Sequence, residues 1–246
     1  MVGEVIAVLS GKGGTGKTSV CAGIATALSE SGLRVLAIDC DVGLRNLDIS
    51  LGIADRAALS FLDISERRYS FDQIMAHPRY PSLYFLTAPM TRTPENISEA
   101  AIIVMLRQAR SLYDYILLDA PAGVDAGFRL AASGADRCIL VTGSDPASIR
   151  DAERTADILE LMGKRQTRLV VNRVNPKMVS TMNLTIDDVM DSAGLPLLGI
   201  VPEDSNVTLA ASFGTPLLHQ TKKGAAAACR RIAKRIQGIP EPINIR

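Results

Sequence analysis

Eight residues near the N-terminus have the composition and spacing of a phosphate-binding loop. The segment Gly11-Lys12-Gly13-Gly14-Thr15-Gly16-Lys17-Thr18 fits the pattern G-x-x-x-x-G-K-[ST]. It follows an apolar run that predicts a strand and opens a helical pattern, which is the context that the motif requires. Its glycines let backbone N–H groups converge on phosphates, Lys17 reaches the β and γ oxygens, and Thr18 offers a hydroxyl to Mg²⁺. The segment therefore predicts an ATP and Mg²⁺ site rather than a plain glycine turn.

Lys12 is the unusual member of this loop, because phosphate chemistry within one subunit does not require a second lysine there. One interpretation is a solvated side chain. The other is a lysine that points away from its own nucleotide and acts on the nucleotide of a facing subunit, as an arginine finger does. The second interpretation makes Lys12 catalytic together with Lys17.

Three carboxylates follow apolar runs at the edge where phosphates are expected. Asp39 and Asp41 come directly after Val35–Ile38, and Asp119 ends the run Tyr115–Leu118. We expect only one of the first two to face the nucleotide. We predict that Asp41 orients the attacking water, that Asp39 supports the metal's water shell, and that Asp119 holds Mg²⁺ through water. Capping, turn or plain strand-end roles are the alternatives.

These side chains need a sheet that brings several strand ends to one edge. Runs rich in Val, Ile and Leu alternate with helical patterns along the chain, and continuous apolar runs suit strands covered on both faces. Right-handed crossovers then predict an α/β P-loop fold with a doubly wound, mainly parallel sheet and helices on both faces. The expected strands are Val5–Leu9, Val35–Ile38, Leu83–Thr87, Tyr115–Leu118, Cys138–Thr142, Leu169–Val171 and Leu197–Val201. The expected helices include Thr18–Ser31, Ser98–Ser111, Ser148–Met162 and Gly224–Gln237.

Length and composition limit the remaining possibilities. The 246 residues, 47% of them hydrophobic, suit one domain over 1–238 followed by a short proline-containing tail over 239–246. A net charge of +1 provides no global field for nucleic acid or an anionic surface. The four cysteines form no C-x-x-C pair, which argues against a zinc site or a disulfide framework. No run approaches the roughly 18 apolar residues of a spanning helix, so we expect a cytoplasmic protein.

Several sequence blocks resemble the MinD/ParA superfamily of deviant Walker A ATPases. The loop K-G-G-x-G-K-T carries the superfamily signature, and the blocks Asp41–Asp48, Leu118–Gly123, Val171–Pro176 and Val201–Asp204 are similar, in order, to those of the septum-site-determining MinD family. The resemblance implies an ATP-hydrolysing switch for division-site placement, with an ATP-dependent homodimer that uses Lys12 across its interface. A ParA-like ATPase that partitions DNA or cargo is the second hypothesis.

The resemblance also implies residues for the base and for partners. Asn172 would hydrogen-bond the adenine edge, Arg173 would lie along the base, and Pro202-Glu203-Asp204 would close that end of the pocket. Ordinary turns are the alternative. Asp151 and Glu153 match acidic positions where the family docks activator and effector proteins, although exposed helix charges are usually only solvated.

The C-terminal segment departs from this family, which usually finishes in an amphipathic membrane-targeting helix. Pro240 and Pro242 forbid a helix in the tail. The preceding helical pattern has an apolar stripe with core spacing and basic residues around it. The stripe is Ala225, Cys229, Ile232 and Ile236, and the basic residues are Arg230, Arg231, Lys234 and Arg235. We therefore expect at most weak, transient peripheral contact with anionic lipid at the inner face of the cell membrane. DNA contact through the same patch stays an open alternative.

Overall fold

A parallel sheet forms the centre of the computed structural model, which describes residues 2–56, 58–90, 93–175 and 185–243. Within these residues seven strands pair in the order β3-β2-β4-β1-β5-β6-β7, and every pair is parallel. The strands are β1 (Glu4–Leu9), β2 (Val35–Asp39), β3 (Leu83–Leu86), β4 (Tyr115–Asp119), β5 (Arg137–Thr142), β6 (Thr167–Val174) and β7 (Leu197–Pro202). Six of them include the whole apolar run expected from the sequence, and β3 ends one residue before its expected end at Thr87, so the predicted sheet is confirmed.

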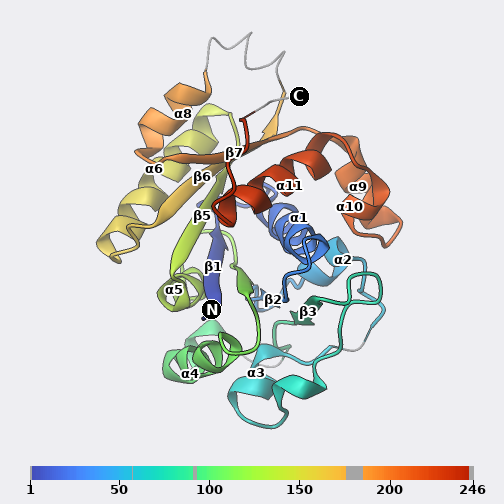
Figure 1. Cartoon of the computed structure of the whole chain (residues 1–246). Helices are drawn as coiled ribbons and strands as arrows, with labels where there is room; N and C mark the ends of the chain where they lie inside the picture. The colour runs from blue at the N-terminus through green and yellow to red at the C-terminus, as the bar shows by residue number, and fades with distance from the viewer. Residues whose placement is uncertain (1, 57, 91–92, 176–184, 244–246) are drawn as a thin grey trace.

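Helices cover the sheet on both faces, as Figure 1 shows. One face packs against α1 (Lys17–Glu30), α2 (Leu47–Leu51), α9 (Ser205–Ser212), α10 (Leu217–Gln220) and α11 (Gly224–Ile236). The other face packs against α3 (Phe61–Ser65), α4 (Glu99–Ala109), α5 (Ala126–Gly134), α6 (Pro146–Leu161) and α8 (Ile186–Ala193). The chain also contains two short 3-10 helices, η1 (Phe71–Gln73) and η2 (Pro94–Asn96). The chain winds to both sides of the central β1, so β1 delivers its loop to the middle of the sheet edge.

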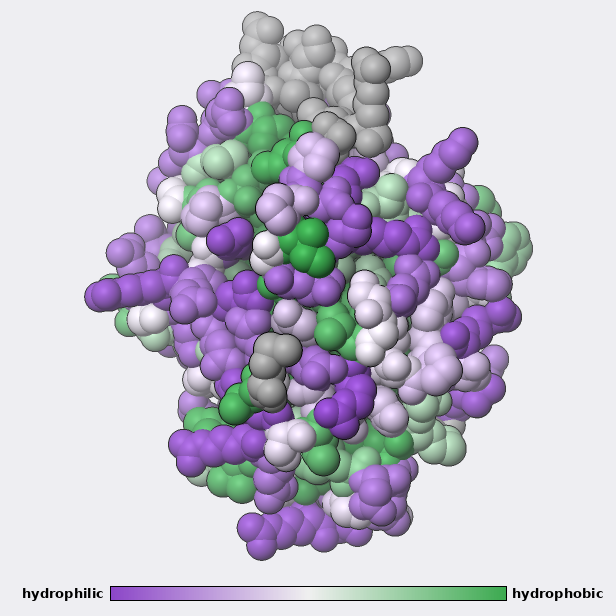
Figure 2. All heavy atoms as spheres, viewed as in Figure 1, coloured by the Kyte–Doolittle hydropathy of each residue, from purple (hydrophilic) through white to green (hydrophobic). Residues whose placement is uncertain are grey.

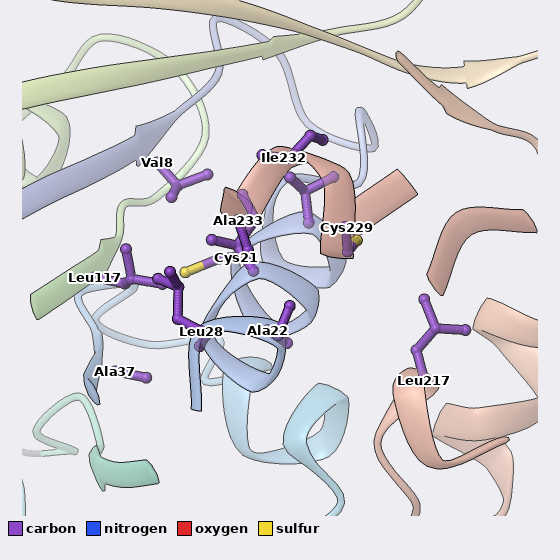
Figure 3. Close-up of a cluster of buried hydrophobic side chains, with 14 of the residues drawn as sticks. Val8, Cys21, Ala22, Leu28, Ala37, Leu117, Leu217, Cys229, Ile232 and Ala233 are labelled. Carbon is purple, nitrogen blue, oxygen red and sulfur yellow. The ribbon is translucent and has the colours of Figure 1, made fainter. Parts of the chain in front are cut away.

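The last helix, α11, belongs to the core of one face. Figure 3 shows Cys229 and Ile232 of α11 beside Cys21 and Ala22 of α1. The helices approach closely at Gly23, where an added Cβ would lie 2.5 Å from the Cys229 sulfur. The apolar stripe predicted for this helix is 1% to 4% exposed, which confirms its core spacing. These side chains are therefore not available for apolar contact with a membrane.

The segment that follows α11 is tied down by Arg235. Its Nε and Nη2 donate to the carbonyls of Glu241 and Pro242 at 3.0 and 2.6 Å, and its Nη1 donates to the Leu198 carbonyl of β7 at 2.7 Å. Lys234 pairs with Glu241. Residues 239–243 contain no helix, as the prolines predict, while 244–246 lie outside the described residues.

Two ion pairs of the described residues involve α11, namely Arg230 with Glu30 and Lys234 with Glu241. Arg230 makes two hydrogen bonds to the Glu30 carboxylate, at 2.7 and 3.0 Å. Hydrophilic side chains cover much of the face in Figure 2, and hydrophobic ones gather in smaller areas between them. Among the described residues, every helix is too short or too polar to cross a bilayer.

Candidate nucleotide-binding site

The loop between β1 and α1 has the backbone that its glycines predict. Gly14 and Gly16 both have a φ of +81°, a region that glycine enters without steric cost. Gly16 is the N-cap of α1, so the loop leads directly into a helix N-terminus, where free N–H groups favour anions. At Gly11 an added Cβ would lie 2.2 Å from the Thr155 hydroxyl of α6. The loop is thus packed between helices of both faces of the sheet.

Lys17 and Asp119 form a buried ion pair at the sheet edge. Lys17 Nζ lies 2.9 Å from Asp119 Oδ1, and the side chains are 6% and 1% exposed. The pairing of Val8 with Asp119 between β1 and β4 places the carboxylate beside the start of the loop. Burial raises the pKa of Asp119, and the nearby Lys17 ammonium opposes that rise. The structure therefore brings together one residue predicted for phosphate and one predicted for Mg²⁺.

Asp39 and Asp41 have different surroundings, because β2 ends at Asp39 and Asp41 lies in the loop that follows. Asp39 is fully buried and accepts hydrogen bonds from the backbone N–H groups of Asp41, Asn46 and Leu47. Burial, together with the neighbouring Asp119, raises its pKa to about 6. Asp41 is partly exposed and lines a cavity with the glycine loop. Asp41 is thus placed to meet a phosphate, whereas the metal role predicted for Asp39 stays a prediction.

Two adjacent cavities of similar size meet at the loop. We call the first the phosphate cavity; it measures about 390 Å³ and is lined by residues 12–19 with Ser10, Asp41, Leu44, Asn46, Ile49, Ser50, Ala122 and Arg173. We call the second the base cavity; it measures about 400 Å³ and contains all five residues predicted for the base, Asn172, Arg173, Pro202, Glu203 and Asp204. They share Gly16, Ser19 and Arg173. One elongated ligand can therefore occupy both.

Two residues that line the base cavity lie at a β-bulge in β6. The pairing of β6 with β7 shifts register between Val171 and Val174, which leaves Asn172 and Arg173 as the irregular residues. Arg173 has a φ of +56°, an uncommon conformation for a residue other than glycine. Asn172 Nδ2 donates to the Thr15 carbonyl at 2.7 Å. The base end and the phosphate loop are thus joined by a buried hydrogen bond.

The floor of the base cavity was not predicted from the sequence. It consists of apolar side chains from α1, α9, α10 and α11, namely Val20, Val207, Leu217, Ala225 and Cys229. Asp204 joins two of these helices, because its carboxylate accepts the N–H of Asn206 and the N–H of Ala225, both at 2.9 Å. Of these residues only Ala225 and Cys229 belong to an apolar stripe predicted from the sequence. No local pattern indicates that the five meet at one cavity. Pro176, which belongs to one of the quoted sequence blocks, lies outside the described residues.

Lys12 lies at the rim of the site, next to the start of α6. Its Nζ is 4.0 Å from Asp145 Oδ1, and the two side chains are 45% and 54% exposed. Asp145 also caps α6 by accepting the Ser148 N–H at 3.0 Å. On the same helix Asp151 is partly exposed and Glu153 is exposed. Asp145 was not singled out in the sequence, because a cap before Pro146 explains it locally.

The geometry defines a class of protein: a P-loop protein whose glycine loop borders two adjoining cavities. Residues 6–217 match the family described as CobQ/CobB/MinD/ParA nucleotide binding domain. The septum site-determining protein MinD of Bacillus subtilis (strain 168) is 36% identical over 248 residues, 99% of this chain and 92% of that protein. The chain belongs to this nucleotide-binding family and, within it, to the MinD family.

Solved structures agree with that assignment. The chain superposes on one from the MinC:MinD cell division protein complex of Aquifex aeolicus with a TM-score of 0.90 and 36% identity, covering 98% of both chains. It superposes on the septum site-determining protein MinD complexed with Mg-ADP from Pyrococcus horikoshii with a TM-score of 0.82 and 25% identity, covering 95% of both.

Proposed function

We propose that this chain is a MinD-type ATPase switch that binds ATP with Mg²⁺, dimerises in its ATP form and acts in division-site placement. The observation that carries the proposal is the meeting of the glycine loop, the Lys17–Asp119 pair and Asp41 beside the base cavity. The relative in Bacillus subtilis is a septum site-determining protein. The DNA-partitioning alternative has less support, because the relatives reported above, which match nearly the whole chain, are MinD proteins.

At the phosphate end, the loop N–H groups and the N-terminus of α1 hold the phosphate oxygens. Lys17 moves its hydrogen bonds from Asp119 to the β and γ oxygens. Thr18 and Asp119 suit Mg²⁺, because Lys17 Nζ lies 3.5 Å from the Thr18 hydroxyl and 2.9 Å from the Asp119 carboxylate, so both oxygens line one place. Bound there, the ion would neutralise charge on the transferred phosphate. In the described residues no cluster of three acidic, His or Cys side chains could hold a metal. Mg²⁺ commonly combines one or two protein ligands with waters and substrate phosphates.

Asp41 acts on the attacking water. It lines the phosphate cavity and its carboxylate is not enclosed like that of Asp39, so it can accept a hydrogen bond from a water beside the γ-phosphate. At the base end, Asn172 already uses its amino group on Thr15. Its carbonyl oxygen is left to accept a hydrogen bond from the adenine amino group, while the apolar floor contacts the ring.

Lys12 serves the facing subunit. Its exposed pair with Asp145 is worth about 0–1 kcal/mol, so releasing the side chain toward a second nucleotide costs little. We further propose a protein partner on α6 near Asp151 and Glu153. The Asp151 carbonyl lies against Gly11, where an added Cβ would approach it to 2.6 Å. A partner bound there would lie close to Gly11, which directly precedes Lys12 in the loop.

Membrane contact, if the protein makes it, is transient and electrostatic. The apolar stripe of α11 is in the core, and Arg230, Lys234 and Arg235 contact groups of the chain itself. The carboxylates of Glu30 and Glu241 offset the charges of Arg230 and Lys234, which reduces the positive charge that α11 can offer to anionic lipid or to DNA.

Complementation tests the role in trans. Lys12→Ala and Asp41→Ala should each bind ATP but hydrolyse it poorly. In a mixed dimer, the subunit without Lys12 keeps its own Asp41 and receives the partner's lysine, so one of two sites is complete. Mixing two inactive variants should therefore restore turnover, whereas heterodimers without activity would show that Lys12 acts in cis. A Lys17→Ala and Asp41→Ala mixture is the control, because neither of its sites contains both Lys17 and Asp41.

A further inference from the structure

The loop between β2 and α2, which carries Asp41, has an unusual backbone. Gly43 has a φ of +116° and Arg45 a φ of +42°. The left-handed region is uncommon for a residue other than glycine, and such conformations persist only where surrounding contacts determine them. Some contact must therefore hold this loop.

Asp39 supplies those contacts. Its Oδ1 accepts the Asp41 N–H at 2.9 Å, and its Oδ2 accepts the N–H groups of Asn46 and Leu47, each at 3.1 Å. Asp41 begins the loop, and Asn46 and Leu47 end it. One carboxylate thus holds both ends of the segment that contains the two left-handed residues. The Asp39 side chain is fully buried and does not line the phosphate cavity.

The far end of α2 is held as well. His77 Nδ1 accepts the Arg79 N–H at 3.1 Å, so its Nε2 carries the proton and donates to the Leu51 carbonyl at 2.8 Å. Leu51 is the last residue of α2. With α2 anchored there and at Leu47, the position of the loop depends on its anchor at Asp39.

We propose that Asp39 is a positioning residue that sets the aim of Asp41 by holding both ends of the 41–47 loop, without touching nucleotide or metal. The inference rests on the proposed hydrolysis and adds a residue that acts through another. It differs from the water-shell role, because a carboxylate that serves a metal would change the dependence on Mg²⁺, whereas a loop anchor changes the protection of particular amides.

The test compares Asp39→Asn with Asp48→Asn. Asparagine has the shape of aspartate, but its amino group turns a donor toward backbone N–H groups, so at least one anchor is lost. Asp48 is a matched control in the same segment, since its carboxylate accepts only the neighbouring Ile49 N–H among the hydrogen bonds that the structure describes. Asp39→Ala, which adds no donor, is the second variant if Asp39→Asn folds poorly. Thermal unfolding checks folding of all variants.

Amide hydrogen exchange by NMR and steady-state kinetics give the decisive readouts. In Asp39→Asn we expect exchange at Asp41, Asn46 and Leu47 to accelerate at least 10-fold, kcat to fall at least 10-fold, and KM and half-saturating Mg²⁺ to stay within 3-fold. Asp48→Asn should leave all of them within 3-fold. Unchanged exchange overturns the inference, as does a 10-fold rise in half-saturating Mg²⁺ with kcat recovered at high Mg²⁺. Wild-type protein without any ATP hydrolysis would instead overturn the proposed function, while exchange would still report the anchor.

Discussion

The two ends of the proposed nucleotide site differ in the side chains that form them. At the phosphate end three charged groups are buried and already bound within the chain: Lys17 pairs with Asp119, and Asp39 accepts three backbone N–H groups. At the base end the floor is apolar and comes from four helices. The hydrogen bond from Asn172 to Thr15 connects the two ends.

This difference determines how each end responds to change. A buried charge that loses its partner is costly, because the remaining charge cannot be solvated. Substituting an apolar side chain of a cavity wall removes only contact area and packing. The phosphate end should therefore show large effects from single atoms, and the base end should show smaller ones.

Lys17→Ala should have the largest effect, because it removes the partner of Asp119 as well as a ligand of the phosphates. We expect the free energy of unfolding of the nucleotide-free protein to fall by about 3–5 kcal/mol and ATP affinity to fall about 100-fold. Urea unfolding and calorimetric titration measure both. Lys12→Ala, at the exposed position of the same loop, should keep affinity within about 3-fold. Equal losses in the two variants would erase the contrast between buried and exposed lysines.

The pH dependence of stability isolates Asp39. Because burial raises its pKa to about 6 from an unfolded value near 3.8, the folded protein binds this proton more tightly. Its stabilising contribution is present below pH 3.8 and is lost as the pH rises through about 6, a change of about 3 kcal/mol. Urea unfolding between pH 4 and 7 should therefore show that the free energy of unfolding of the wild type falls relative to that of Asp39→Asn as the pH rises through this window. If the two proteins instead show the same dependence of the free energy of unfolding on pH, the pKa of Asp39 is not raised in the folded protein.

Asn172→Ala tests the connection between the ends. The buried Thr15 carbonyl loses its donor, so we expect the free energy of unfolding to fall by about 1–3 kcal/mol. ATP affinity should fall about 10-fold, through the displaced loop and the lost adenine contact together. Thr208→Ala, at an exposed position of the base cavity, should change stability by less than about 0.5 kcal/mol. If both variants behave like wild type, the two ends are independent.

Asp145→Asn should have the smallest effect. Asparagine still caps α6 through its carbonyl oxygen. The change removes the charge that faces Lys12 and replaces the oxygen that accepts the Ser148 hydroxyl by an amino group. The pair is exposed and 4.0 Å long, and we expect a stability change below about 1 kcal/mol that shrinks further in high salt. Thermal unfolding at low and high salt measures it. A larger change that persists in high salt would mean that the rim resembles the buried phosphate end.

Local sequence predicted most of the phosphate end. The glycine positions, Lys17 and Thr18 lie within one short segment, where spacing alone sets backbone shape and side-chain reach. Asp41 and Asp119 follow apolar strands, and parallel strands end at one edge, so their approach to the loop follows from the sheet. The strands and the core stripe of α11 were predicted because hydrophobic periodicity is a local signal.

Tertiary structure decided the rest. Whether Asp39 meets metal or backbone depends on how the loop after it folds back, and the Lys17–Asp119 pair joins residues that lie 102 positions apart. The base-cavity floor and the β-bulge at Asn172 arise where β6, β7 and α11 pack together. Sequence spacing determines contacts within a segment, because the backbone limits its reach there. Contacts between distant segments are set by the joint burial of their apolar faces, which becomes defined only when the whole sheet has assembled.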